Sequence, residues 1–194
     1  MIKNKNRSYY IGASDTKYVM MNWNTKTFKK WWLIKLGLDE NNYQNKYTKA
    51  GTNYEHKIID ALNIPNIEKD KQIIVLERLR INLDANTKNE IHEIKTYNYE
   101  NGFDINYHKE YIEQVQVQMY GSGIHKAKID AYGLIEEEYI NYFEEIDLER
   151  LTSYEIEYDE KWIIEKYLPR ITILIKCLKE MRFPTQKEME MVKC

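Results

Sequence analysis

The sequence predicts an α/β fold in which a central mixed β-sheet is flanked by helices. Helix-compatible segments come first, strand-like segments follow with one helix inserted between them, and a long helix closes the chain. Doubly wound folds alternate strand and helix throughout, so this order favours an α/β sandwich instead. The 194 residues, 43% of them hydrophobic, suffice for one substantial core, and we expect a single domain over residues 1–194.

Composition excludes several classes of protein. Only three prolines and seven glycines occur, and no repeat or low-complexity linker divides the chain. No apolar run approaches the roughly 18 residues of a membrane span, and the first residues lack the apolar stretch of a signal peptide. We therefore expect a cytoplasmic protein with no membrane partner. Two cysteines are too few for a cysteine-based zinc or iron–sulfur site.

Charge is distributed unevenly along the chain, although the formal net charge is only −2. Residues 1–57 hold eleven Lys or Arg and four Asp or Glu, so the remainder carries a net charge of −9. Such a division suits a protein that binds phosphates with one part and a metal with another. It is equally compatible with a Lys-rich surface that only contacts solvent.

Three helices are expected before the first strand. Ser14 is a favoured N-cap residue and precedes a helix-compatible run, which predicts a short helix over residues 14–21. Apolar side chains at helical spacing predict a second helix over residues 27–36. A third is predicted over residues 49–63, with Glu55 near the edge of its apolar stripe.

Alternating or β-branched runs predict the strands of the sheet. These runs are residues 73–76, 80–84, 91–95, 126–135, 140–146 and 154–158. The inserted helix is predicted over residues 109–120, where Tyr111, Gln114, Val115 and Gln118 form one stripe. A stripe that mixes amides with apolar groups suits a surface facing something polar inside the fold. The last helix is predicted over residues 159–181, followed by a short tail at 184–194.

A predicted hairpin gathers the residues with the clearest chemistry. Asp84 ends its first strand, and Glu93 and Lys95 lie two residues apart on its second strand. Side chains two apart on a strand share a face, so Glu93 and Lys95 point together while Ile94 points into the core. The two carboxylates can hold Mg²⁺, and Lys95 can position the water that attacks a phosphorus atom or help to deprotonate it.

The same residues allow a simpler interpretation. An acidic-x-Lys triplet also begins at Asp15, Glu55 and Asp159, although none of these lies in a strand-like run beside an upstream carboxylate. A solvent-facing hairpin with charges paired across its strands, at about 0.2–1 kcal/mol each, has the same pattern. The hairpin alone leaves both interpretations open.

Five motifs in order give the hairpin its context. They are Arg7 with Ile11-Gly-Ala-Ser14, Gly51-Thr-Asn-Tyr54-Glu55, Asp84 with Glu93-Ile94-Lys95, Tyr111-Ile-Glu-Gln114-Val-Gln116, and Asp159-Glu-Lys-Trp162. With them the chain resembles the phage lambda exonuclease family, or YqaJ-type viral recombinases, within the PD-(D/E)XK nuclease superfamily. The resemblance spans about residues 7–183 and implies a restriction-endonuclease-like core.

The resemblance also implies a metal site. Asp84, Glu93 and the backbone carbonyl of Ile94 would bind a catalytic Mg²⁺, for which Mn²⁺ would substitute. Glu55 would help to hold a second ion. In a two-metal site the ions stabilise both the incoming and the departing oxygen atoms.

Further residues take roles from the resemblance. Lys95 and Gln114 would position the attacking water and the scissile phosphate. Arg7 and Ser14 match positions that hold the 5′-phosphate of the degraded strand, and a guanidinium with a hydroxyl at a helix N-terminus makes a plausible anion pocket.

The function implied is a Mg²⁺-dependent 5′→3′ exonuclease on double-stranded DNA ends, active in phage-type recombination and repair in a bacterial or phage-infected cell. A single-strand-annealing protein as partner and a homo-oligomer, a ring-shaped trimer, are expected on the same ground. Two alternatives keep the scaffold. One is a PD-(D/E)XK endonuclease or junction-cleaving enzyme, and the other is a catalytically inactive DNA-binding protein.

Overall fold

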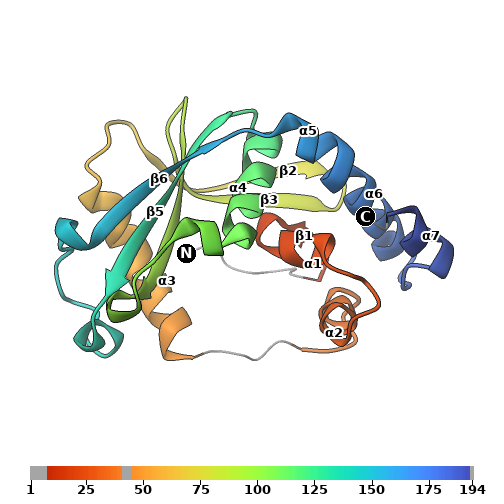
Figure 1. The fold of residues 1–194 in the computed structure, drawn as a ribbon, viewed down its shortest axis with the longest axis horizontal. Coiled ribbons are helices and arrows are strands. Elements are labelled where there is room, and N and C mark those ends of the chain that lie inside the picture. The colour runs from red at the N-terminus through yellow and green to blue at the C-terminus, as the bar shows by residue number, and fades with distance from the viewer. Residues whose placement is uncertain (1–7, 41–44, 193–194) are drawn as a thin grey trace.

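The computed structural model describes residues 8–40 and 45–192 and shows a mixed sheet with helices packed on it (Figure 1). Within these ranges the sheet has six strands in the order β1-β3-β4-β5-β6, and β2 pairs with β3 outside this path. The strands are β1 (Ile11–Gly12), β2 (Glu68–Leu76), β3 (Leu79–Asn86), β4 (Ile91–Asn98), β5 (Lys126–Leu134) and β6 (Leu151–Glu157). Pairs β1·β3 and β4·β5 are parallel and the others antiparallel, which confirms the predicted mixed sheet.

The predicted helices are present with small shifts of their ends. The α-helices are α1 (Thr16–Met20), α2 (Lys26–Lys35), α3 (Lys46–Ala61), α4 (Lys109–Ser122), α5 (Glu160–Trp162), α6 (Leu168–Lys179) and α7 (Gln186–Met191). Short 3₁₀ turns are η1 (Ala13–Asp15), η2 (Tyr99–Asn101), η3 (Ile105–Tyr107), η4 (Glu136–Tyr139) and η5 (Leu148–Arg150), and η6 (Ile163–Tyr167) is a π-helical turn. None of the helices in the described ranges is long and apolar enough to cross a membrane.

The sheet separates two apolar cores, because successive side chains of a strand point to opposite faces. The larger core lies under α4 together with α1, α2 and α6, and includes Trp32, Val115 and Ile91 of β4. The smaller core lies under α3 and includes Tyr54 and Ile94. Strand β4 therefore presents its odd-numbered residues to α4 and its even-numbered residues to α3.

The hairpin between β3 and β4 is paired over a very short length. Its antiparallel register contains only Ala85↔His92 and Asn86↔Ile91, next to the turn. Beyond these pairs the two strands diverge, whereas β4 pairs with β5 in parallel over its whole length. The backbone edge of β4 after His92 is consequently open toward the side chain of Asp84.

The strand predicted at residues 140–146 is wrong. After η4 this segment forms no strand, and Ile140 and Phe143 are strongly exposed. Strand β5 already has β4 on one side and β6 on the other, with the β6 register running from Lys126↔Glu157 to Tyr132↔Leu151. No edge of β5 is left for this segment, so it cannot join the sheet, and only Tyr142 and Ile146 of its apolar residues pack against the smaller core.

The helix cap predicted at Ser14 is also wrong. Strand β1 pairs with β3 through Gly12, and the chain stays extended up to that residue. The N–H of Gly12 donates to Asp15 Oδ2 at 2.8 Å, and Asp15 also accepts from Lys35 at 2.6 Å and from Trp31 Nε1 at 3.0 Å. Ser14 lies exposed in η1.

The closing helix is interrupted, and the predicted tail contains a further helix. Pro169 lacks a backbone N–H, and its ring would clash with the carbonyl four residues earlier in a regular α-helix. The π-helical turn η6 ends two residues before this proline and absorbs the irregularity. In the tail, α7 is capped by Thr185, whose hydroxyl accepts from the N–H of Glu188 at 3.3 Å.

Candidate active site

Glu93 is the centre of a buried hydrogen-bond cluster beneath α4. Its side chain, on a residue only 2% exposed, accepts from Lys95 Nζ and from Gln114 Nε2 through Oε1, each at 2.5 Å. Its Oε2 accepts from Gln118 Nε2 at 2.6 Å. A buried carboxylate is costly unless it is hydrogen-bonded, and these three donors fix its position. The predicted common face of Glu93 and Lys95 is confirmed.

Asp84 faces Glu93 across the gap between the strands. Its Oδ2 accepts from the backbone N–H of Ile94 at 2.9 Å, in place of the strand-to-strand bond that is missing there. The N–H and C=O of one strand residue point to the same side, so the carbonyl of Ile94 also projects into the gap. Burial, and then the charge of Glu93, raise the pKa of Asp84 well above its usual range.

Lys95 is held as a cation within this cluster. Its Nζ lies 3.5 Å from Gln114 Oε1 and 4.9 Å from the centre of the Tyr111 ring, in addition to its bond with Glu93. Burial by itself would lower the pKa of Lys95, but Glu93 and Asp84 outweigh burial and the pKa is raised. Lys95 is therefore suited to stabilise negative charge, and it is protonated at neutral pH.

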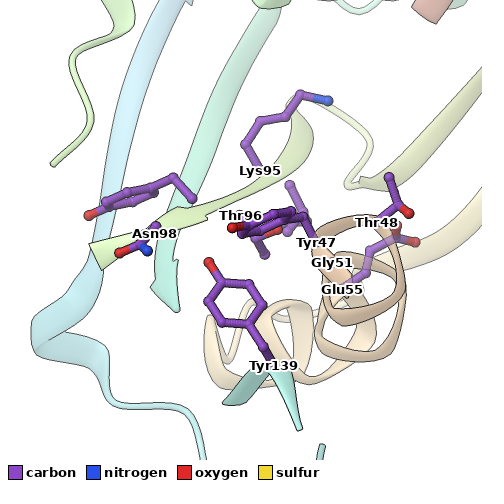
Figure 2. A pocket seen from close by; sticks show the side chains of 10 residues that line it. Tyr47, Thr48, Gly51, Glu55, Lys95, Thr96, Asn98 and Tyr139 are labelled. Carbon is purple, nitrogen blue, oxygen red and sulfur yellow. The ribbon is translucent and has the colours of Figure 1, made fainter. Parts of the chain in front are cut away.

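Glu55 reaches the same place from the other face of the sheet. It lies on α3, and it lines a common pocket with Lys95 (Figure 2). Burial, followed by the charge of Glu93, raises the pKa of Glu55. Ligand atoms of Glu55, His56 and Asp70 also lie within 4.8 Å of one another, with His56 Nε2 3.0 Å from Asp70 Oδ2.

These groups fit a divalent cation. The carboxylates of Asp84, Glu93 and Glu55 surround one lysine, and burial followed by the charge of Glu93 raises the pKa of both Asp84 and Glu55. Hard oxygen ligands, namely carboxylates and a backbone carbonyl, are those preferred by Mg²⁺ and Mn²⁺. Asp84, Glu93 and the Ile94 carbonyl could hold one ion at the gap, with Glu55 beside it.

Gln118 belongs to the hydrogen-bond cluster around Glu93, although the predicted site did not include it. It is fully buried, and its Nε2 donates to Glu93 Oε2 and also lies 2.9 Å from the carbonyl oxygen of Asn82 on β3. Its stripe with Gln114 on α4 was the pattern that could have identified it. By contrast, Gln116 points elsewhere, donating to the Glu157 carbonyl and accepting from the Asp159 N–H, each at 2.7 Å.

The two residues predicted to bind a 5′-phosphate are not part of this cluster. Arg7 lies outside the described residues. Ser14 lies in η1, which packs beside α4, and its exposed side chain makes no hydrogen bond with any residue in the described ranges. His92, next to Glu93, faces away from this cluster, with Nδ1 2.8 Å from Asp130 Oδ2.

Solved structures share this arrangement of elements. The alkaline exonuclease LHK-Exo from Laribacter hongkongensis matches with a TM-score of 0.67 and 18% identity, covering 95% of this chain and 92% of the other. This chain has the fold of that exonuclease. LHK-Exo in complex with dAMP matches with a TM-score of 0.66 and 18% identity, covering 96% of this chain and 93% of the other. A phage related exonuclease from Haemophilus somnus 129PT matches with a TM-score of 0.63 and 16% identity, covering 94% of this chain and 95% of the other.

The comparison confirms the predicted restriction-endonuclease-like core. Neither a protein-family model nor a curated protein sequence matches the chain. At 16–18% identity the likeness concerns the path of the backbone. The chemistry of the site is argued from its own side chains.

Proposed function

We propose that this protein is a metal-dependent nuclease that hydrolyses phosphodiester bonds of DNA. The observation that supports this most directly is the convergence of Asp84, Glu93 and Lys95 where β3 and β4 separate. A simple hairpin with surface ion pairs would leave these groups in water. Here Glu93 is buried and held by three donors, and the pKa of Asp84 is raised by burial and by Glu93.

Each residue has a definite role in the proposed reaction. A divalent cation bound by Asp84 and Glu93 would supply Lewis acidity and a water of lowered pKa. Lys95, which is protonated, would stabilise negative charge developing on the phosphate oxygens. Gln114 contacts both Lys95 and Glu93, so it would keep the ammonium and the carboxylate in register with the substrate.

The specific activity we propose is 5′→3′ digestion of double-stranded DNA from its ends, with Mg²⁺ and with Mn²⁺ as a substitute. The ordered motifs support it, and so does a fold shared with two proteins named as exonucleases, one of them solved with a deoxynucleotide. In this proposal Ser14, exposed beside α4, contacts the 5′-phosphate together with Arg7.

Digestion of three DNA substrates tests the proposal. Linear duplex with a 5′-phosphate should be degraded fastest, linear duplex without it more slowly, and a covalently closed circle not at all. The Glu93→Gln variant, which keeps the shape of the side chain but removes its charge, should be inactive on each substrate. Cutting of the closed circle would replace the exonuclease with an endonuclease or junction-cleaving enzyme.

Activity that is equal in the wild type and in Glu93→Gln would identify a contaminant and leave a DNA-binding protein as the function. The trimer and the single-strand-annealing partner are proposed on the family resemblance alone. Light scattering of the purified chain tests the trimer. Co-purification with a candidate annealing protein tests the proposed partner.

A further inference from the structure

A pocket of about 310 Å³ lies directly beside the candidate active site (Figure 2). It opens between the first turns of α3 and the last residues of β4. Glu55 and Lys95 belong both to its lining and to the site described above. A molecule that filled this pocket would therefore have one end next to the groups proposed to act on phosphate.

Two tyrosine rings form the far wall of the pocket. Tyr47 and Tyr139 lie edge to face, with ring centres 5.2 Å apart. Lys46 Nζ lies 5.3 Å from the centre of the Tyr47 ring and 5.2 Å from that of Tyr139, and pairs with Glu136 at 2.7 Å. Tyr139 is only 4% exposed and belongs to the core under α3, whereas Tyr47 is 51% exposed. The wall is thus a fixed ring with an accessible one beside it.

Polar groups of the pocket are available to a ligand. Asn98 accepts from the N–H of Glu100 at 2.9 Å through its side-chain oxygen, and its amide NH₂ has no hydrogen-bond partner in the described part of the chain. The hydroxyls of Tyr139 and Thr96 likewise make no hydrogen bond with any described residue. Figure 2 shows the hydroxyl ends of Tyr47 and Tyr139 directed toward the side of the pocket where Asn98 lies.

The floor of the pocket depends on a glycine. At Gly51, α3 passes so close to β4 that an added Cβ would lie 3.0 Å from Thr96 Oγ1. Helix and strand can therefore approach one another without a side chain filling the space between them. The volume matches the lower end of the range for small-molecule sites, about 300–1,000 Å³, which suits one nucleoside and excludes a duplex.

We propose that this tyrosine pocket, formed by Tyr47, Tyr139, Thr96 and Asn98, holds the sugar and base of the nucleotide whose phosphate lies at Glu55 and Lys95. The inference rests on the proposed nuclease function for the placement of the phosphate. Every base has an aromatic face that can stack on Tyr47, and hydroxyls both donate and accept hydrogen bonds. The pocket therefore binds all four deoxynucleotides with similar affinity and reads no sequence.

Calorimetric binding of two ligands that differ only by the base tests the proposal. Deoxyadenosine 5′-monophosphate and deoxyribose 5-phosphate are titrated into the full chain in the presence of Ca²⁺. We expect the nucleotide to bind about tenfold or more tightly than the sugar phosphate, as stacking on an aromatic side chain would give. Tyr47→Ala should abolish this difference, and Tyr47→Phe should retain it.

Two further variants separate stacking from folding and from nonspecific loss. Tyr139→Phe keeps the buried ring and removes only its hydroxyl, so nucleotide affinity should fall by about two- to tenfold. Tyr107, 84% exposed and outside the pocket, is the matched control, and Tyr107→Ala should bind both ligands like the wild type. Because Tyr47 is half exposed, Tyr47→Ala should unfold at nearly the wild-type temperature.

The outcomes distinguish the pocket from the nuclease. Equal affinity for nucleotide and sugar phosphate overturns the pocket while leaving the nuclease untouched. A base-dependent affinity that Tyr47→Ala removes supports the pocket even if DNA digestion fails. A base-dependent affinity unaffected by Tyr47→Ala and Tyr139→Phe places the base elsewhere and overturns the proposal.

Discussion

Gln118 donates its side-chain amide to Glu93 at 2.6 Å, and the same nitrogen lies 2.9 Å from the carbonyl oxygen of Asn82. One residue of α4 thus contacts both β3 and β4 at the place where these strands stop pairing. The orientation of the candidate metal ligand Glu93 depends on this helix as well as on its own strand.

Replacement of Gln118 by leucine should weaken both folding and metal binding. The buried carboxylate of Glu93 would lose one of its three donors, a loss of about 1.5–3 kcal/mol for a hydrogen bond to a charged group. We expect a lower free energy of unfolding in urea, weaker Mn²⁺ binding by calorimetry, and a slower rate on linear duplex DNA.

Gln116→Leu is the matched control on the same helix. It removes the bonds with Glu157 and Asp159, so it should reduce stability by a similar amount. Its Mn²⁺ affinity should stay at the wild-type value. Equal loss of Mn²⁺ affinity in both variants would show that the effect is general destabilisation of α4, and Gln118 would lose its positioning role.

Lys95→Met should separate metal binding from chemistry. The substitution removes the cation from among Asp84, Glu93 and Glu55, so Mn²⁺ should bind as tightly as to the wild type or more tightly. The rate at saturating DNA should fall by about a hundredfold or more. Lys109→Met is the control, because Lys109 is exposed and its 3.2 Å pair with the buried Glu113 does not involve Asp84, Glu93 or Glu55. A Lys95→Met enzyme with normal turnover would exclude the proposed role of the ammonium.

Stabilisation by divalent cations should increase with pH. Burial raises the pKa of Asp84 and of Glu55, so the metal-free fold favours their protonated forms. The stability contributed by these groups is present below their unfolded pKa, near 4, and is lost as pH rises through the folded value. A cation opposes this loss only where the carboxylates ionise.

The shift of the unfolding temperature on adding Mn²⁺ should therefore be larger at about pH 8 than at about pH 5.5. Metal binding should also release protons, measurable as a dependence of the calorimetric heat on the buffer. Asp84→Asn should flatten most of the pH dependence. An equal shift of the unfolding temperature at both pH values in the wild type would contradict the raised pKa of Asp84.

The attachment of α7 should have the opposite pH dependence. Glu188 accepts from Arg182 Nη1 and Nη2, each at 2.8 Å, and Arg182 lowers the pKa of Glu188. Its stabilising effect is present above the unfolded pKa and is lost as pH falls through the folded one. Glu188→Gln should destabilise the chain by about 0.5–1 kcal/mol at neutral pH, and its unfolding curve should converge with that of the wild type in acid. A difference that persists below about pH 2 would assign the effect to packing.

The sequence was most informative where a short-range rule decides the geometry. Alternation along β4 placed Glu93 and Lys95 on one face and Ile94 on the other, and the hairpin brought Asp84 beside them. The helical stripe of Gln114 and Gln118 indicated a polar interior contact, which the structure identifies as Glu93.

Prediction from the sequence failed where residues distant along the chain determine the structure. Residues 140–146 have strand-like composition, but both edges of β5 are occupied by strands from other parts of the chain. The tyrosine pocket combines the start of α3, the end of β4 and the 3₁₀ turn before residue 140. No local pattern joins these three segments, and only their packing reveals the site.

Because β3 and β4 pair over such a short length, the sheet consists of two weakly joined blocks of strands. One block holds β1, β2 and β3, and the other holds β4, β5 and β6. Asp84 belongs to the first block and Glu93 to the second. A cation bound by both residues would cross-link the two blocks. Amide hydrogens of residues 93–95 should then exchange with solvent more slowly when the cation binds. The rigidity of the sheet would therefore indicate whether the metal site is occupied.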